Sequence, residues 1–275
     1  MDRRILERRR RVRAEAARKR RRIAFSLFAL VLVLGAGYGV SRTPLFAVGE
    51  VRVRGVEPTR ADEVLATAAV TTGGNVLDVD TAAVAARVEA LPWVADARVR
   101  RLPGAIEVRV TPRVPAASVR LDGAAWIVDE GGWLIGGGAR EDLVVIEAPD
   151  AVLPPVGERV ADPGVRNALA VHAALPQPLR GMVRRYHAPS ARALRLLLAA
   201  TPAEHRGPPT PTVWVRFGLA DRVEAKARVI ELLLAQARDQ AAQEGTPVPE
   251  GTLPPGIEEL DVRAPDNPVL IPARG

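Results

Sequence analysis

The chain has 275 residues, a formal net charge of +7 and no cysteine, so a disulfide framework and a cysteine nucleophile are excluded. This length is enough for two modest domains in addition to a short terminal segment. The charge is uneven: residues 1–22 hold twelve Lys or Arg and three acids, a charge of +9, which leaves −2 for the remaining chain.

An uncharged apolar run, residues 23–41, follows this basic tail directly. Its 18 positions from Ile23 to Val40 give a helix of about 27 Å, close to the roughly 30 Å hydrocarbon core of a bilayer. We therefore predict a single transmembrane helix. A cleaved signal peptide is the alternative, but the charged region ahead of the run is long, and residues 38–42 (YGVSR) make a poor cleavage site.

The tail, residues 1–22, is predicted to stay in the cytoplasm, because positive charge next to a span fixes that end inside. The same charge attracts an anionic inner leaflet. No nucleic acid is expected as a partner, because the tail has no aromatic side chain to stack on bases. The residues expected to orient the span are Arg18, Lys19, Arg20, Arg21 and Arg22.

The first segment outside the span predicts a strand, two helices and two further strands. Residues 48–56 alternate apolar and polar side chains, which is typical of a half-buried strand. A helix is expected to follow, with Thr59 in its capping signal, and a second helix must stop before Pro92. Residues 94–101 and 105–113 alternate again, on either side of a Pro-Gly turn.

Several short segments add a resemblance to this order of elements. They are residues 44–48 (PLFAV) leading into 51–55 (VRVRG), 74–77 (GNVL), 91–101 (LPWVADARVRR) and 103–110 (PGAIEVRV). Behind a single span and an arginine-rich tail, they resemble the POTRA domain of the FtsQ/DivIB family of bacterial cell-division proteins, and we assign this domain to residues 46–113. The alternative is a POTRA-type chaperone or a transport and barrel-assembly module. Other POTRA-bearing proteins carry several repeats, whereas this chain carries one, which favours the cell-division family.

Residues 114–263 predict a second, β-rich domain of mixed α+β class, which corresponds to the β domain of that family. Short alternating strands are expected at 117–121, 124–128, 133–135 and 143–146, and later at 193–199 and 212–217. A helix is expected from Asp162 to Leu175, with Asp162 as its cap, and a long helix after Phe217. Residues 202–211, with four prolines, and 244–255 are expected to be loops, and residues 264–275 an extended or loose tail.

No group of residues in the sequence indicates catalysis, a metal or a cofactor. His172, His187 and His205 are too far apart for a helical pair of metal ligands and have no acidic partner at metal spacing. A serine-hydrolase motif and a phosphate-binding loop are also missing. We therefore predict a non-enzymatic scaffold, with an exported hydrolase as a more distant alternative.

The resemblance implies where such a scaffold works and what it binds. It implies a place in the cell membrane at the division septum, binding of FtsB-like and FtsL-like proteins through the β domain, and contacts with other division proteins through the POTRA domain. We expect the last strand to lie at or near a sheet edge and to receive a partner strand; alternatively, its charges only protect an open edge. The expected partner-binding residues are Ile257, Glu258, Glu259, Leu260, Asp261, Val262 and Arg263.

Overall fold

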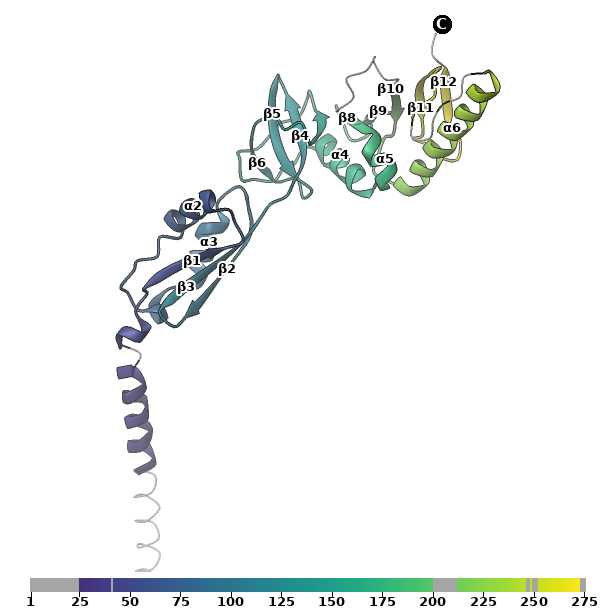
Figure 1. Ribbon diagram of the computed structural model, residues 1–275. Coiled ribbons are helices and arrows are strands. Elements are labelled where there is room, and N and C mark those ends of the chain that lie inside the picture. The colour runs from purple at the N-terminus through teal and green to yellow at the C-terminus, as the bar shows by residue number, and fades with distance from the viewer. Residues whose placement is uncertain (1–24, 41, 200–211, 246–247, 249–251, 273–275) are drawn as a thin grey trace, which may run out of the picture. The chain divides into compact units, whose positions relative to one another are not determined.

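The computed structural model describes residues 25–40, 42–199, 212–245, 248 and 252–272 (Figure 1). Its contacts divide the chain into two compact units. The first extends to Val88 and includes Asp96–Thr111, and the second combines Glu89–Ala95 with the chain from Pro112 onward. Both helices and strands are present in each unit, as expected for the α+β class.

The N-terminal region is described only in part. Residues 25–40 are helical, whereas the five basic residues at 18–22 and the predicted span's residues 23, 24 and 41 lie outside the described part. Within the described residues, no helix combines the length and the apolar character needed to cross a bilayer.

The first unit has the predicted order of strand, helix, helix, strand and strand. Its sheet has the order β1-β3-β2, and β1 runs parallel to β3. Two short 3-10 turns, η1 and η2, precede β1 and α3. The elements are η1 (Pro44–Phe46), β1 (Glu50–Arg54), α2 (Pro58–Ala68), η2 (Val76–Asp78), α3 (Thr81–Glu89), β2 (Val94–Leu102) and β3 (Ala105–Pro112).

One side of this small sheet forms the core of the first unit. Ile106, Val108 and Val110 alternate with polar residues along β3 and are fully buried, together with Val64 of α2 and Val88 of α3. This is the pattern of a sheet with one face covered by helices. The apolar periodicity in the sequence therefore identified the core side of this domain.

The start of α2 differs from the prediction. Thr59 is not the cap: Glu57 occupies that position without a side-chain cap bond, and Pro58 begins the helix. Proline suits the first helical turn because its fixed backbone angle is already helical and its missing N–H has no partner there. Pro58 thus sets the boundary two residues earlier than the expected capping signal.

The second unit contains one large sheet in the described residues. Its nine strands have the order β12-β11-β10-β9-β8-β7-β4-β5-β6. The pairs β4–β7, β7–β8 and β10–β11 are parallel and the other neighbours are antiparallel. The strands are β4 (Pro115–Leu121), β5 (Ala124–Asp129), β6 (Leu134–Gly137), β7 (Val144–Glu147), β8 (Val183–His187), β9 (Arg195–Ala199), β10 (Thr212–Arg216), β11 (Ile257–Asp261) and β12 (Val269–Pro272).

Three helices pack with these strands into one core. They are α4 (Pro163–Ala174), α5 (Gln177–Met182) and α6 (Val223–Gln243), and Figure 1 shows them beside the strands β8 to β12. Asp162 caps α4 as predicted, because its Oδ1 accepts a hydrogen bond from the Val165 N–H at 2.9 Å. Fully buried side chains from all three helices, such as Leu179 and Ile230, join those of the strands.

A buried lysine fixes the connection between β10 and α6. Lys226 is only 1% exposed, and its ammonium donates to the carbonyl oxygens of Phe217 at 3.2 Å and Leu219 at 2.9 Å. It also forms a short ion pair with the carboxylate of Asp221. The cation therefore satisfies three acceptors of the loop that leads from the sheet into the long helix.

Three elements were missed by the sequence analysis, namely α5, β8 and β12. Residues 264–275 were expected to be extended or loose, and of these Val269–Pro272 are extended and paired with β11, so this part of the tail is not loose. The predicted loop at 202–211 lies outside the described residues.

Candidate partner-binding edge

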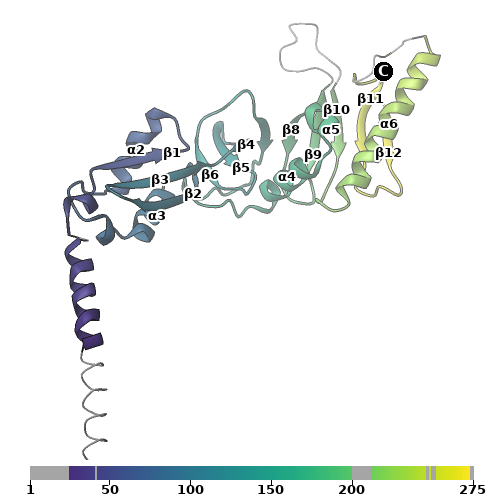
Figure 2. The same cartoon turned by 60° about the horizontal axis from the view of Figure 1, so that its bottom comes forward.

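The strand predicted to bind a partner lies one position inside the sheet edge. β11 pairs in parallel with β10 on one side and antiparallel with β12 on the other. The strand thus lies near the sheet edge, as one form of the prediction had it, but its outer side is not open, because β12 pairs with it from Ile257 to Asp261. β12 is the last strand in the sheet order, and Figure 2 shows it with β11 beside α6.

The hydrogen bonds of β11 show which backbone groups of β12 remain open. The Val262 N–H donates to the Arg216 carbonyl oxygen at 3.0 Å, so Val262 directs its backbone toward β10. Backbone groups alternate sides along a strand, so Asp261 directs its own toward β12, where it pairs with Val269. The next residue, Leu270, must then direct its N–H and C=O groups away from β11.

The outer strand also carries exposed apolar side chains. Val269 is 49% exposed and Leu270 is 38% exposed, in a strand of only four residues. Soluble proteins commonly protect such an edge with charge, and β12 has no charged residue. Among the strands that the structure describes, none pairs with the outer side of β12, and an apolar strand of this kind is suited to accept an added strand.

The predicted site residues fall on the two faces of β11 as expected. Leu260 and Val262 are fully buried in the core. On the other face, Arg263 Nη2 lies 2.6 Å from Asp261 Oδ2. This bond lowers the pKa of Asp261, and Asp261 raises the pKa of the Arg263 guanidinium.

Glu259 connects β11 to its neighbour β10 and to β9, the next strand beyond it. Its carboxylate accepts from Arg195 of β9 and Arg216 of β10, with both N–O distances at 2.7 Å. Arg195 also lies over the Trp214 ring, with its guanidinium carbon 4.8 Å from the ring centroid. Burial raises the pKa of Glu259, but the two arginines together lower it further, so the net direction is downward.

An ion pair holds the loop between β11 and β12. Arg222, at the start of α6, donates two bonds to the Asp266 carboxylate at 2.6 and 2.8 Å. Glu258 is exposed, and Ile257 lies next to a bulge in the pairing with β12. The sequence analysis missed Arg195, Arg216 and Arg222 because their partners lie far away in the chain.

The two histidines that the structure describes, His172 and His187, each lie close to one other polar side chain. His172 Nδ1 lies 3.1 Å from the Tyr186 hydroxyl, and burial lowers the pKa of His172 and raises that of Tyr186. His187 Nδ1 lies 3.9 Å from the Glu147 carboxylate, and His205 is outside the described residues. Among the described residues, no three His, Asp or Glu side chains gather as a metal site would require.

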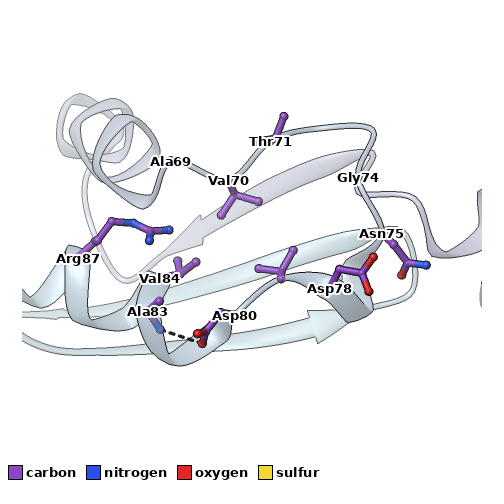
Figure 3. A pocket seen from close by; sticks show the side chains of 11 residues that line it. Ala69, Val70, Thr71, Gly74, Asn75, Asp78, Asp80, Ala83, Val84 and Arg87 are labelled. Carbon is purple, nitrogen blue, oxygen red and sulfur yellow. Dashed lines mark hydrogen bonds between the residues drawn. The ribbon is translucent and has the colours of Figure 1, made fainter.

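A hollow of about 330 Å³ lies in the first unit, between the end of α2 and the start of α3. Figure 3 shows Val70, Val84 and Arg87 among its lining residues. Arg87 already donates to the Ala68 carbonyl oxygen, at 3.2 and 2.7 Å, and Asp80 accepts from the first N–H groups of α3. These polar groups are therefore engaged within the domain, and the hollow carries no ligand assignment.

The first unit matches a known family model. Residues 46–113 fit the POTRA domain of FtsQ type. Over 213 residues, the chain is 33% identical to the cell division protein FtsQ of Mycolicibacterium smegmatis, which covers 76% of this chain and 58% of the relative. The chain is similar to FtsQ proteins over about three quarters of its length. The FtsQ of Mycobacterium tuberculosis (strain H37Rv) is 30% identical over 210 residues, 75% of this chain and 60% of the relative.

Another relative matches over a shorter stretch. The FtsQ of Anaeromyxobacter sp. (strain K) is 38% identical over 128 residues, which is 46% of this chain and 43% of that protein. The chain thus spans less than two thirds of the curated relatives it matches. The POTRA match and the FtsQ relatives agree with the resemblance to the FtsQ/DivIB family of cell-division proteins and with the POTRA domain predicted at residues 46–113.

Proposed function

We propose that this FtsQ-like chain is a single-pass membrane scaffold that holds FtsB-like and FtsL-like division proteins at the septum. The observation that carries the proposal is the edge at β12, which offers an open backbone and exposed apolar side chains. A strand of the FtsB-like partner adds to β12, and the FtsL-like protein joins through the same domain. The POTRA domain contacts other division proteins.

The site residues predicted from the sequence lie on β11, the strand next to β12. Asp261 and Arg263 lie on the face of β11 away from the core, and β12 separates them from the position of an added strand. Glu259 holds β11 in place through Arg195 and Arg216. In this proposal β12 makes the main-chain hydrogen bonds to the partner strand, and the charged residues of β11 lie one strand behind it.

The anchor is the second part of the proposal, and its support is the sequence. Residues 23–40 have no charge and follow a tail of charge +9, which places the tail in the cytoplasm and both domains outside. The FtsQ-type POTRA match supports a division role over the alternative of a transport or barrel-assembly module.

Proline substitutions in β12 test the strand addition. Proline has no N–H, so Leu270→Pro removes an outward donor and Ile271→Pro removes one that faces β11. The full chain in detergent micelles is titrated with the extracytoplasmic segment of the FtsB-like partner, and its thermal melting is followed. We expect Leu270→Pro to weaken binding at least about tenfold with little change in the melting temperature.

Two controls separate backbone from side-chain effects. Leu270→Ala keeps the outward N–H, so it is expected to bind more tightly than Leu270→Pro. Ile271→Pro is expected to lower the melting temperature, because it breaks the pairing with β11. A folded Leu270→Pro chain with unchanged affinity would show that the partner does not add to β12.

A further inference from the structure

The sheet of the POTRA domain has one face that the described residues leave open. Along β3, the buried residues Ile106, Val108 and Val110 alternate with Glu107, Arg109 and Thr111, so the latter point away from the helices. β1 shows the same alternation, and its partners in β3 are known from the register, with Arg52 beside Glu107. Charged side chains from all three strands therefore share this face.

Arginine dominates the open face. Arg52 and Arg54 come from β1, and Arg98 and Arg100 alternate with the inward Ala97 and Val99 of β2. Together with Arg109 there are five arginines against the three acids of the same face. The acids are Glu50, Asp96 and Glu107, which leaves a surplus of two positive charges.

The pairing within the face leaves donors free. Glu107 is shared, with Arg54 Nε at 2.8 Å from one carboxylate oxygen and Arg109 Nη2 at 3.7 Å from the other. Arg98 pairs with Asp96 at 3.1 Å, whereas Arg100 has no partner among the described residues. The side chains of Arg54, Arg98 and Arg109 are more than half exposed, for example 72% for Arg98.

Guanidinium groups with free donors suit phosphate, which they bind in a fork geometry. The chain enters this sheet at β1, and only residues 41–49 separate β1 from the apolar helix, a reach of about 32 Å at most. We propose that the open face of the POTRA sheet binds the phosphate headgroups of an anionic bilayer. This rests on the proposed membrane anchor, which keeps the face close to the lipid surface.

Fluorescence quenching by labelled headgroups tests this face in the full chain. The chain has no cysteine, so a single dye can be attached at Thr111→Cys on the open face or at Ala66→Cys on the exposed side of α2. The chain is placed in vesicles of phosphatidylcholine alone or with about 30% phosphatidylglycerol. Two surplus charges, at about fivefold each, favour the lipid-bound face by about 25-fold.

We expect phosphatidylglycerol to increase quenching of the Thr111→Cys dye and not of the Ala66→Cys dye. The increase should disappear in 0.5 M salt and in the triple variant Arg98→Gln, Arg100→Gln and Arg109→Gln. A matched variant with the same change in net charge, Arg140→Gln, Arg192→Gln and Arg228→Gln, lies in the second domain and should keep the increase.

The anchor has its own readout. Flotation of the chain with pure phosphatidylcholine vesicles reports the apolar helix, because this lipid has no net charge. Failure to float there contradicts the anchor. Equal quenching of the Thr111→Cys dye with and without phosphatidylglycerol, or a triple variant that behaves as the parent chain, would overturn headgroup binding and leave the anchor intact.

Discussion

Glu259 is the residue whose replacement tests most directly how β11 is attached to the sheet. Its side chain is 8% exposed and accepts from two arginines on two other strands, each at 2.7 Å. Glu259→Gln keeps the shape and removes the charge, and Glu259→Ala removes both bonds. β10 and β11 pair through only three residue pairs, so the lost ion pairs are a large part of what holds these two strands together.

The expected magnitude follows from these contacts. A hydrogen bond between charged groups contributes about 1.5–3 kcal/mol. Arg195 and Arg216 are 39% and 44% exposed, so water can bind their guanidinium groups when the Glu259 carboxylate is removed. The loss of stability is therefore smaller than for two fully buried bonds. We expect Glu259→Ala to lower the free energy of unfolding by about 2–3 kcal/mol and Glu259→Gln by about 1–2 kcal/mol.

Denaturation with urea, followed by circular dichroism over a pH series, measures the effect. The folded pKa of Glu259 lies below its ordinary value of 4.5. Its contribution to stability is therefore present above pH 4.5 and is lost as the pH falls through the lowered folded value. The difference between the parent chain and Glu259→Gln should shrink below pH 4.5. A loss under about 0.5 kcal/mol for Glu259→Ala at pH 7 would refute the role of this ion triad.

Two further predictions concern the loop before α6 and the topology. Lys226→Met should lower the free energy of unfolding by about 3 kcal/mol, because the buried Phe217 carbonyl and the partly buried Leu219 carbonyl lose a charged donor. Asp221→Asn should cost under about 1 kcal/mol, because Asp221 is exposed, and equal losses in urea denaturation would contradict this. For the topology, Ser190→Cys is exposed and should react with an impermeant maleimide in intact cells whose outer barrier is permeable to it. Ser118 is 1% exposed and is unsuitable, and labelling of Ser190→Cys only after lysis would reverse the orientation.

The periodicity of the sequence predicted most strands, because alternation reports which side of a strand meets the core. It failed at β8, where a bulge between Val183 and Arg185 interrupts the alternation, and two adjacent arginines resemble a surface loop. It also failed at β12, where Pro272 and the nearby prolines suggested a loose segment. An edge strand tolerates proline because one side of its backbone needs no partner.

The candidate site could be predicted only as a region. The faces of Leu260 and Val262 follow from alternation, whereas the neighbours of β11 follow from register, which a single sequence does not contain. Glu259 and Arg195 are 64 positions apart in the chain, and no local pattern connects them. For this reason the sequence identified β11 as part of the site and left the strand beyond it unseen.

The parallel pairing of β10 with β11 has a consequence for the order in which the domain folds. β8, β9 and β10 are antiparallel neighbours that can form from nearby chain, but β11 reaches β10 only after the crossover through α6. Closing such a long loop is slow, and an isolated β11–β12 hairpin is marginal in water. We therefore expect the edge at β12 to be the last part of the domain to form. If a partner strand adds to β12 as proposed, a chain that has not finished folding has no edge for it to bind. Partner binding would then begin only after the rest of the domain has folded.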